Sequence, residues 1–150
     1  MTVELRAATA RDLPVLCEME TCLFPHGPWS EGALSGHLAA GHTLSLLLFC
    51  DGVPAGSLLA GFSPPEGELY RIGVLPAYRR NGYGRRLLSV FFEEADRRGA
   101  DTLFLEVRES NTAARALYGA TGFIGYCRRD NYYRDPCEAA LLLRADRRMG

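Results

Sequence analysis

The chain has 150 residues, of which 47% are hydrophobic and 23% charged, with a net charge of −1. This length and composition predict one globular domain over residues 1–150 that holds a core without disulfides or metal. All 17 basic residues are Arg, which excludes a Schiff-base lysine and a lysine-bearing phosphate loop.

The charge is unevenly distributed along the chain. Residues 1–70 have a net charge of −6, and residues 71–150, with fifteen Arg and ten acidic residues, have +5. The near-neutral total argues against a nucleic-acid partner, although a local basic patch would bind an anion. The acidic half would attract a cationic substrate. No apolar run approaches 18 residues, so no membrane span or membrane partner is predicted.

The cysteines and histidines show no metal-binding spacing, so no metal is predicted. The five cysteines also lack a CxxC pair, which is typical of free thiols in a reducing cytoplasm, and we expect a cytoplasmic protein. These residues are Cys17, Cys22, Cys50, Cys127 and Cys137, with His26, His37 and His42.

Hydrophobic periodicity and turn residues predict eleven elements in the order strand, helix, helix, three strands, helix, strand, helix and two strands. The three consecutive strands over residues 43–75 are joined by short turns and are predicted to form an antiparallel meander. The strand–helix–strand unit over residues 68–107 needs a parallel crossover, so the sheet is expected to be mixed. The predicted elements cover residues 3–7, 12–23, 30–40, 43–50, 53–62, 68–75, 84–98, 102–107, 110–121, 123–133 and 139–143.

Two glycines lie where the strand ending at Leu75 turns into the next helix, in the segment Arg79-Arg-Asn-Gly82-Tyr-Gly84-Arg-Arg. Glycine lets the backbone approach a ligand, and the helix N-terminus adds free N–H groups and a partial positive charge. With four Arg around it, this turn is a candidate pyrophosphate site. The alternative is a polar loop with glycine for turn geometry. The dinucleotide-binding fingerprint fits poorly because its third glycine is missing.

A carboxylate and a phenol follow on the next strand and helix. Alternation places Phe104 and Glu106 on one face of the strand, and partial desolvation there would raise the pKa of Glu106 toward that of a useful base. On the helix, Asn111, Arg115 and Tyr118 form one stripe that begins beside the end of that strand. The alternatives are a solvated Glu106, a core Tyr118 and an Asn111 that supports the helix start.

The motif Arg79-x-x-Gly82-x-Gly84 resembles the Q/R-x-x-G-x-G/A signature of the GNAT superfamily of N-acetyltransferases, and the element order is similar too. Three further segments resemble its RimI-type ribosomal-protein-alanine N-acetyltransferases. They are Leu105-Glu-Val-Arg-x-Ser-Asn-x-x-Ala-x-x-Leu-Tyr118-x-x-x-Gly-Phe123, Pro28-Trp29-Ser30 and Arg129-x-Asn131-Tyr132-Tyr133. One departure is Arg71, at a position where such enzymes often have Asn.

The resemblance implies an α+β, three-layer GNAT-like acyl-CoA N-acyltransferase fold and an enzyme that transfers acetyl from acetyl-CoA. The acceptor would be a protein N-terminus, possibly that of a ribosomal protein, attacking directly in a ternary complex. Glu106 would be the proton acceptor and Tyr118 the proton donor. The implied residues for acetyl-CoA are Ile72, Gly73, Val74, Arg80, Asn81, Gly82, Tyr83, Gly84, Arg85 and Asn111, the last on the pantetheine arm.

Two other functions remain open on the sequence. The first is an acetyltransferase for another amine, such as a lysine side chain, a polyamine or an antibiotic. The second is a CoA-binding regulatory module without turnover, against which the set of Glu106, Asn111 and Tyr118 argues. If another phenol were the acid, Tyr126 is the next one along the chain.

Overall fold

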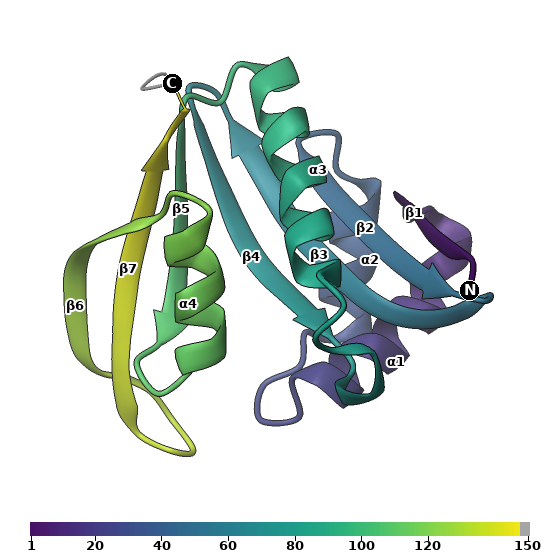
Figure 1. The fold of residues 1–150 in the computed structure, drawn as a ribbon, viewed down its shortest axis with the longest axis horizontal. Coiled ribbons are helices and arrows are strands. Elements are labelled where there is room, and N and C mark those ends of the chain that lie inside the picture. The colour runs from purple at the N-terminus through teal and green to yellow at the C-terminus, as the bar shows by residue number, and fades with distance from the viewer. Residues whose placement is uncertain (148–150) are drawn as a thin grey trace.

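The computed structural model describes residues 1–147, which form a seven-stranded sheet with helices on both faces (Figure 1). The strand order is β1-β2-β3-β4-β5-β7-β6, and every neighbouring pair is antiparallel except β4 and β5. The strands are β1 (Val3–Ala7), β2 (Thr43–Cys50), β3 (Val53–Ser63), β4 (Glu66–Val74), β5 (Thr102–Arg108), β6 (Ile124–Tyr133) and β7 (Glu138–Asp146).

Four helices complete the three layers. They are α1 (Leu13–Leu23), α2 (Glu31–Ala39), α3 (Tyr83–Arg98) and α4 (Thr112–Ala120), with short 3-10 turns at Ala10–Asp12 and Pro76–Tyr78. Alternation along β2 feeds both faces of the sheet: Leu46 and Leu48 pack under α3, whereas Leu47 packs under α1 and α2. Within residues 1–147, no helix is both long and apolar enough to cross a membrane.

The predicted element order and the mixed sheet are confirmed. The last strand is longer than predicted, because β7 continues to Asp146. Its extra residues alternate between buried Ala145 and exposed polar side chains, and they pair with Thr102 and Leu103 at the start of β5. We retain the prediction of one domain over residues 1–150, of which 148–150 lie outside the described part.

Strands β4 and β5 pair over only three residues and then separate. Their register runs from Glu66 opposite Thr102 to Glu68 opposite Phe104, although β4 continues to Val74 and β5 to Arg108. Gly67 allows the close pairing at this end, because a Cβ there would lie 2.8 Å from Leu103 Cδ2. Figure 1 shows the two strands diverging from this point. The sheet therefore opens along the carboxyl-terminal halves of β4 and β5.

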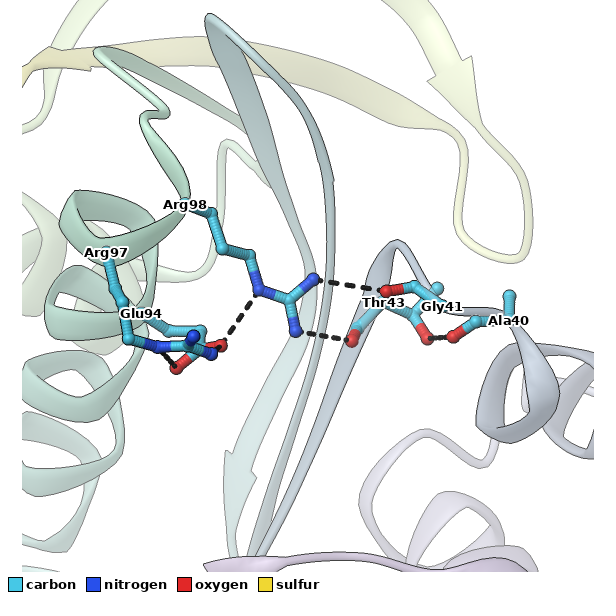
Figure 2. Close-up of polar contacts among 6 residues, drawn as sticks. All are labelled: Ala40, Gly41, Thr43, Glu94, Arg97 and Arg98. Carbon is cyan, nitrogen blue, oxygen red and sulfur yellow. Dashed lines mark hydrogen bonds and ion pairs between the residues drawn. The ribbon is translucent and has the colours of Figure 1, made fainter.

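The far end of α3 is fixed to the sheet by Arg98 (Figure 2). Its guanidinium donates to the carbonyl oxygens of Gly41 (3.4 Å) and Thr43 (3.2 Å), at the start of β2. Glu94, one turn back on α3, accepts from Arg98 Nε at 2.8 Å and also pairs with Arg97. These contacts attach the carboxyl-terminal end of α3 to the start of β2.

Candidate active site

A cleft of about 820 Å³ lies where β4 and β5 separate. Four of the predicted site residues line it: Ile72 from β4, Glu106 from β5, and Asn111 and Tyr118 from the start and body of α4. Its other walls come from the loop after α1, from β4 and from the end of β6, through Phe24, Trp29, Glu68, Tyr70, Tyr132 and Tyr133.

Glu106 shares one face of β5 with Phe104, as predicted, and its carboxylate faces the cleft. Its side chain is exposed, so the predicted desolvation is wrong: β5 is open on this face because α1 and α2 cover only the other half of the sheet. The carboxylate helps to raise the pKa of two phenols of β6. Its hydrogen bond raises the pKa of Tyr132, and its charge, after burial, helps to raise the pKa of Tyr133 to about 12.

Tyr118 is the most buried polar side chain of the cleft, with 6% of its surface exposed. Its ring packs edge-to-face on Phe123, with the centroids 5.8 Å apart. Its hydroxyl makes no hydrogen bond to any residue in 1–147 and reaches the surface of the cleft. Burial, and secondarily the phenol of Tyr133, raises the pKa of Tyr118, so the hydroxyl remains protonated at neutral pH. A protonated phenol that faces the cleft is able to donate a proton there.

Asn111 caps α4. Its side-chain oxygen accepts a hydrogen bond from the backbone N–H of Ala114 at 3.2 Å, as the alternative of a helix-start residue predicted. The amide nitrogen of Asn111 remains for a ligand in the cleft, which it also lines. Capping and ligand contact are therefore compatible.

The glycine turn forms the start of α3. Gly82 is the N-cap, with φ 77° and ψ 14° in the left-handed region, and its carbonyl accepts the first helical hydrogen bond, from Arg86. The N–H groups of Tyr83, Gly84 and Arg85 precede that bond, so they have no intrahelical acceptor, and no side chain caps them. Three donors at the positive end of a helix suit a phosphate group.

Side chains of the same turn hold its shape. Arg79 Nε donates to the carbonyl of Val74 at 2.9 Å, and the Asn81 amide donates to the carbonyls of Tyr78 (3.0 Å) and Arg79 (3.2 Å). Tyr83 is buried in the core, so only its backbone faces outward. Among residues 1–147, none of the four Arg around the turn forms an ion pair with a carboxylate; they are Arg79, Arg80, Arg85 and Arg86.

Since the family resemblance implies that this turn binds acetyl-CoA, replacing Gly82 by Ala is expected to weaken that binding. A Cβ at Gly82 meets no atom within 4 Å, so the effect comes only from the left-handed backbone, which costs an alanine about 1–2 kcal/mol. The KM for acetyl-CoA should rise, whereas G119A, which also meets nothing within 4 Å and lies inside α4, should leave it unchanged. Equal KM values for the two variants would contradict a binding role for the turn geometry.

The remaining predicted residues on β4 lie between the cleft and this turn. Gly73 is covered by Leu23 of α1, whose Cδ1 would lie 2.9 Å from an added Cβ, and the Val74 side chain packs against the core under α3. Since β4 has no partner strand on its β5 side here, its backbone groups on that edge are available to a ligand.

An ion pair holds the loop between α1 and α2 against β4. Glu20 is 2% exposed, and its Oε1 lies 3.2 Å from Arg71 Nε and accepts from the backbone N–H of Trp29 at 3.0 Å. Arg71 also donates to the carbonyl of Gly27 and lies over the ring of Phe24, 4.5 Å from its centroid. Arg71 therefore ties the loop that forms one wall of the cleft to the strand that forms the other.

Replacing Arg71 by Ala is expected to destabilise the protein by about 3 kcal/mol, because Glu20 would be left as a buried charge without its partner. Burial already raises the pKa of Glu20, and Arg71 opposes that rise. Urea unfolding at pH 7 measures the loss. The double variant R71A/E20Q, which buries no charge, should recover part of it. A single variant as stable as the wild type would contradict this account of the pair.

Several residues of the cleft were not predicted as site residues: Trp29, Glu68, Tyr70, Tyr132 and Tyr133. Two signals could have indicated them: the segments with Trp29 and with Tyr132-Tyr133 carry the family resemblance, and Glu68 is a polar residue on a central strand. The second-choice phenol, Tyr126, does not line the cleft, and its ring packs edge-to-face on Phe104, with the centroids 6.0 Å apart. Tyr133 does line the cleft, so it replaces Tyr126 as the alternative acid. The described residues contain no cluster that would hold a metal ion, and all five cysteines are free thiols.

Comparison with known proteins identifies the family. Residues 13–123 match the model of the acetyltransferase (GNAT) family. The chain belongs to this family. Within it, the chain is 37% identical to the [ribosomal protein bS18]-alanine N-acetyltransferase of Salmonella typhimurium over 132 residues, which are 88% of this chain and 86% of that one.

Two further relatives agree with this assignment. The N-alpha-acetyltransferase RimI of Mycobacterium tuberculosis is 36% identical over an alignment of 154 positions, gaps included, which covers 96% of this chain and 92% of that one. The crystal structure of the ribosomal-protein-S18-alanine N-acetyltransferase from Escherichia coli superimposes with a TM-score of 0.88 at 33% identity, covering 97% of this chain and 94% of that one. The GNAT protein described here is thus an N-acetyltransferase with a GNAT fold.

Proposed function

We propose that this GNAT protein transfers the acetyl group of acetyl-CoA to the α-amino group of a protein N-terminus, with a ribosomal protein as a candidate acceptor. One observation carries the proposal: Glu106 and Tyr118 line one cleft where β4 and β5 separate, and the chain leads from β4 to the free N–H groups at the start of α3. The names of the relatives support the choice of an α-amine, and we retain the cytoplasm as its location.

The acetyl donor would bind along the opening between β4 and β5. Backbone N–H groups of residues 82–85, with Arg80 and Arg85, would hold the pyrophosphate, and Asn81 would keep the turn in shape. The pantetheine arm would pass the free edge of β4 at Ile72, Gly73 and Val74 and reach Asn111. Such an arrangement places the thioester between Glu106 and Tyr118.

The acceptor nitrogen would then attack the thioester carbonyl directly. Glu106 accepts the proton of the amine, directly or through water, and a backbone N–H near Val74 stabilises the oxyanion. The C–N bond forms, the C–S bond breaks, and Tyr118 gives its proton to the departing thiolate. An α-amine, with a pKa of about 7.7–8.0, needs far less help than a lysine at about 10.4. An exposed carboxylate is therefore an adequate base.

Acetylation of defined acceptors by the purified protein tests the proposal. Three are compared: a peptide that begins with alanine and has a free α-amine, the same peptide with a blocked α-amine and an internal lysine, and a polyamine. Mass spectrometry should locate the acetyl group on the α-amine of the first. Acetylation confined to the lysine or the polyamine would show that the α-amine is not the acceptor. Acetyl-CoA binding without any product would favour the regulatory module.

A further inference from the structure

A second carboxylate lies beside Glu106 in the cleft. Glu68 is the last residue of β4 that pairs with β5, opposite Phe104, and Glu106 lies two residues further along β5 on the same face as Phe104. Both carboxylates line the cleft. The two carboxylates are close enough to interact electrostatically. Desolvation, and secondarily the charge of Glu106, raises the pKa of Glu68, and both carboxylates contribute to the raised pKa of Tyr132.

Neither carboxylate has a cationic partner in residues 1–147. The two Arg of β4 and β5 that line the same cleft are already engaged: Arg71 pairs with Glu20 and Arg108 with Glu138. The two other cationic side chains of the lining, His26 and Arg134, are exposed and form no ion pair with the carboxylates. Two like charges without a counter-ion in a partly desolvated cleft favour the binding of a cation there.

An independent observation indicates that this cleft is made for a ligand. Tyr118 is 94% buried, lines the same cleft, and has no hydrogen-bond partner in the described chain. The ring of Tyr118 is buried, whereas its hydroxyl reaches the surface of the cleft and is free to bond to a bound molecule. Aromatic side chains of Trp29, Tyr70 and Tyr132 complete a wall of the kind that suits an organic cation.

We propose that Glu68 is a specificity-determining residue that, together with Glu106, binds the acceptor in its ammonium form. This inference rests on the proposed function, since it concerns the same acceptor. At pH 7 most of an α-amine with a pKa of about 7.7–8.0 is protonated, so the acceptor arrives as a cation. An N–H bond of the ammonium then breaks, its proton passes to Glu106, and the electron pair stays on nitrogen. Glu68 keeps its charge throughout.

Peptide binding in the presence of CoA, which carries no acetyl group, tests this role without turnover. Calorimetry compares a peptide that begins with alanine and its des-amino analogue, in which hydrogen replaces the α-amine. The wild type should bind the amine peptide at least about tenfold more tightly, as expected for hydrogen bonds to a charged group. E68Q should lose most of that preference, and E66Q, which removes the same charge from the same strand outside the cleft, should retain it.

The outcomes separate this inference from the proposed function. A preference that is equal in wild type and E68Q, or absent from the wild type, overturns the role of Glu68. With acetyl-CoA in place of CoA, E68Q should raise the KM for the amine peptide, and a change confined to kcat would also overturn it. If the wild type acetylates no amine peptide, the proposed function fails, whatever the binding preference shows.

Discussion

The variant E106Q is expected to lower kcat/KM for an N-terminal peptide by about 10²- to 10⁴-fold, the usual contribution of a general base. Gln is nearly isosteric with Glu, and the Glu106 side chain is exposed, so the fold and the cleft should remain intact. The loss should fall mainly on kcat. Steady-state assays of thiol release measure it, with E66Q, an exposed carboxylate outside the cleft, as the matched control.

The pH dependence of E106Q carries a second test. Without a base, the reaction depends on the acceptor that is already neutral, whose fraction rises through about pH 7.7–8.0. The residual kcat/KM of E106Q should therefore rise steeply between about pH 6 and 9, and the wild type should rise less. If E106Q has the same kcat/KM as the wild type over this range, Glu106 is not the base. Glu68 would then be the next residue to replace.

The variant Y118F is expected to lower kcat by about 100-fold, because the thiolate would leave without a positioned proton donor. Since the raised pKa of Tyr118 keeps its hydroxyl protonated, the wild type should show no falling limb from this residue up to about pH 9. The KM for acetyl-CoA should change little, because Phe retains the ring contact with Phe123.

Two other phenols serve as controls for Y118F. Tyr126 does not line the cleft, and its ring packs on Phe104, so Y126F should have wild-type activity. Tyr133 lies half-buried in the cleft, with its pKa raised to about 12. Its phenol also contributes to the raised pKa of Tyr118. If Y133F loses activity and Y118F does not, the acid is Tyr133.

Local patterns predict most of the fold and the position of the glycine turn. The apolar run of β2, the Asp-Gly pair at residues 51–52 that follows it and the helical period of α3 are features of neighbouring residues, and each predicted element is present. The length of β7 was underestimated because its last residues owe their strand conformation to pairing with Thr102 and Leu103, which are distant in sequence.

The site was predicted less completely, because its chemistry depends on which strand faces which. The exposure of Glu106 follows from the half of the sheet that α1 and α2 leave uncovered, and no period within β5 reports it. The Glu20–Arg71 pair joins residues 51 positions apart, and Glu68 meets Glu106 only through the parallel register. Tyr126 and Tyr133 are both phenols on β6, and only the fold shows which one reaches the cleft.

Mass spectrometry of protein N-termini from cells that carry the wild-type gene, the E106Q variant or no copy tests the central claim most directly. The account predicts at least one protein whose N-terminal α-amine is acetylated in the wild type and free in the other two strains. The same N-termini acetylated in all three strains would contradict it.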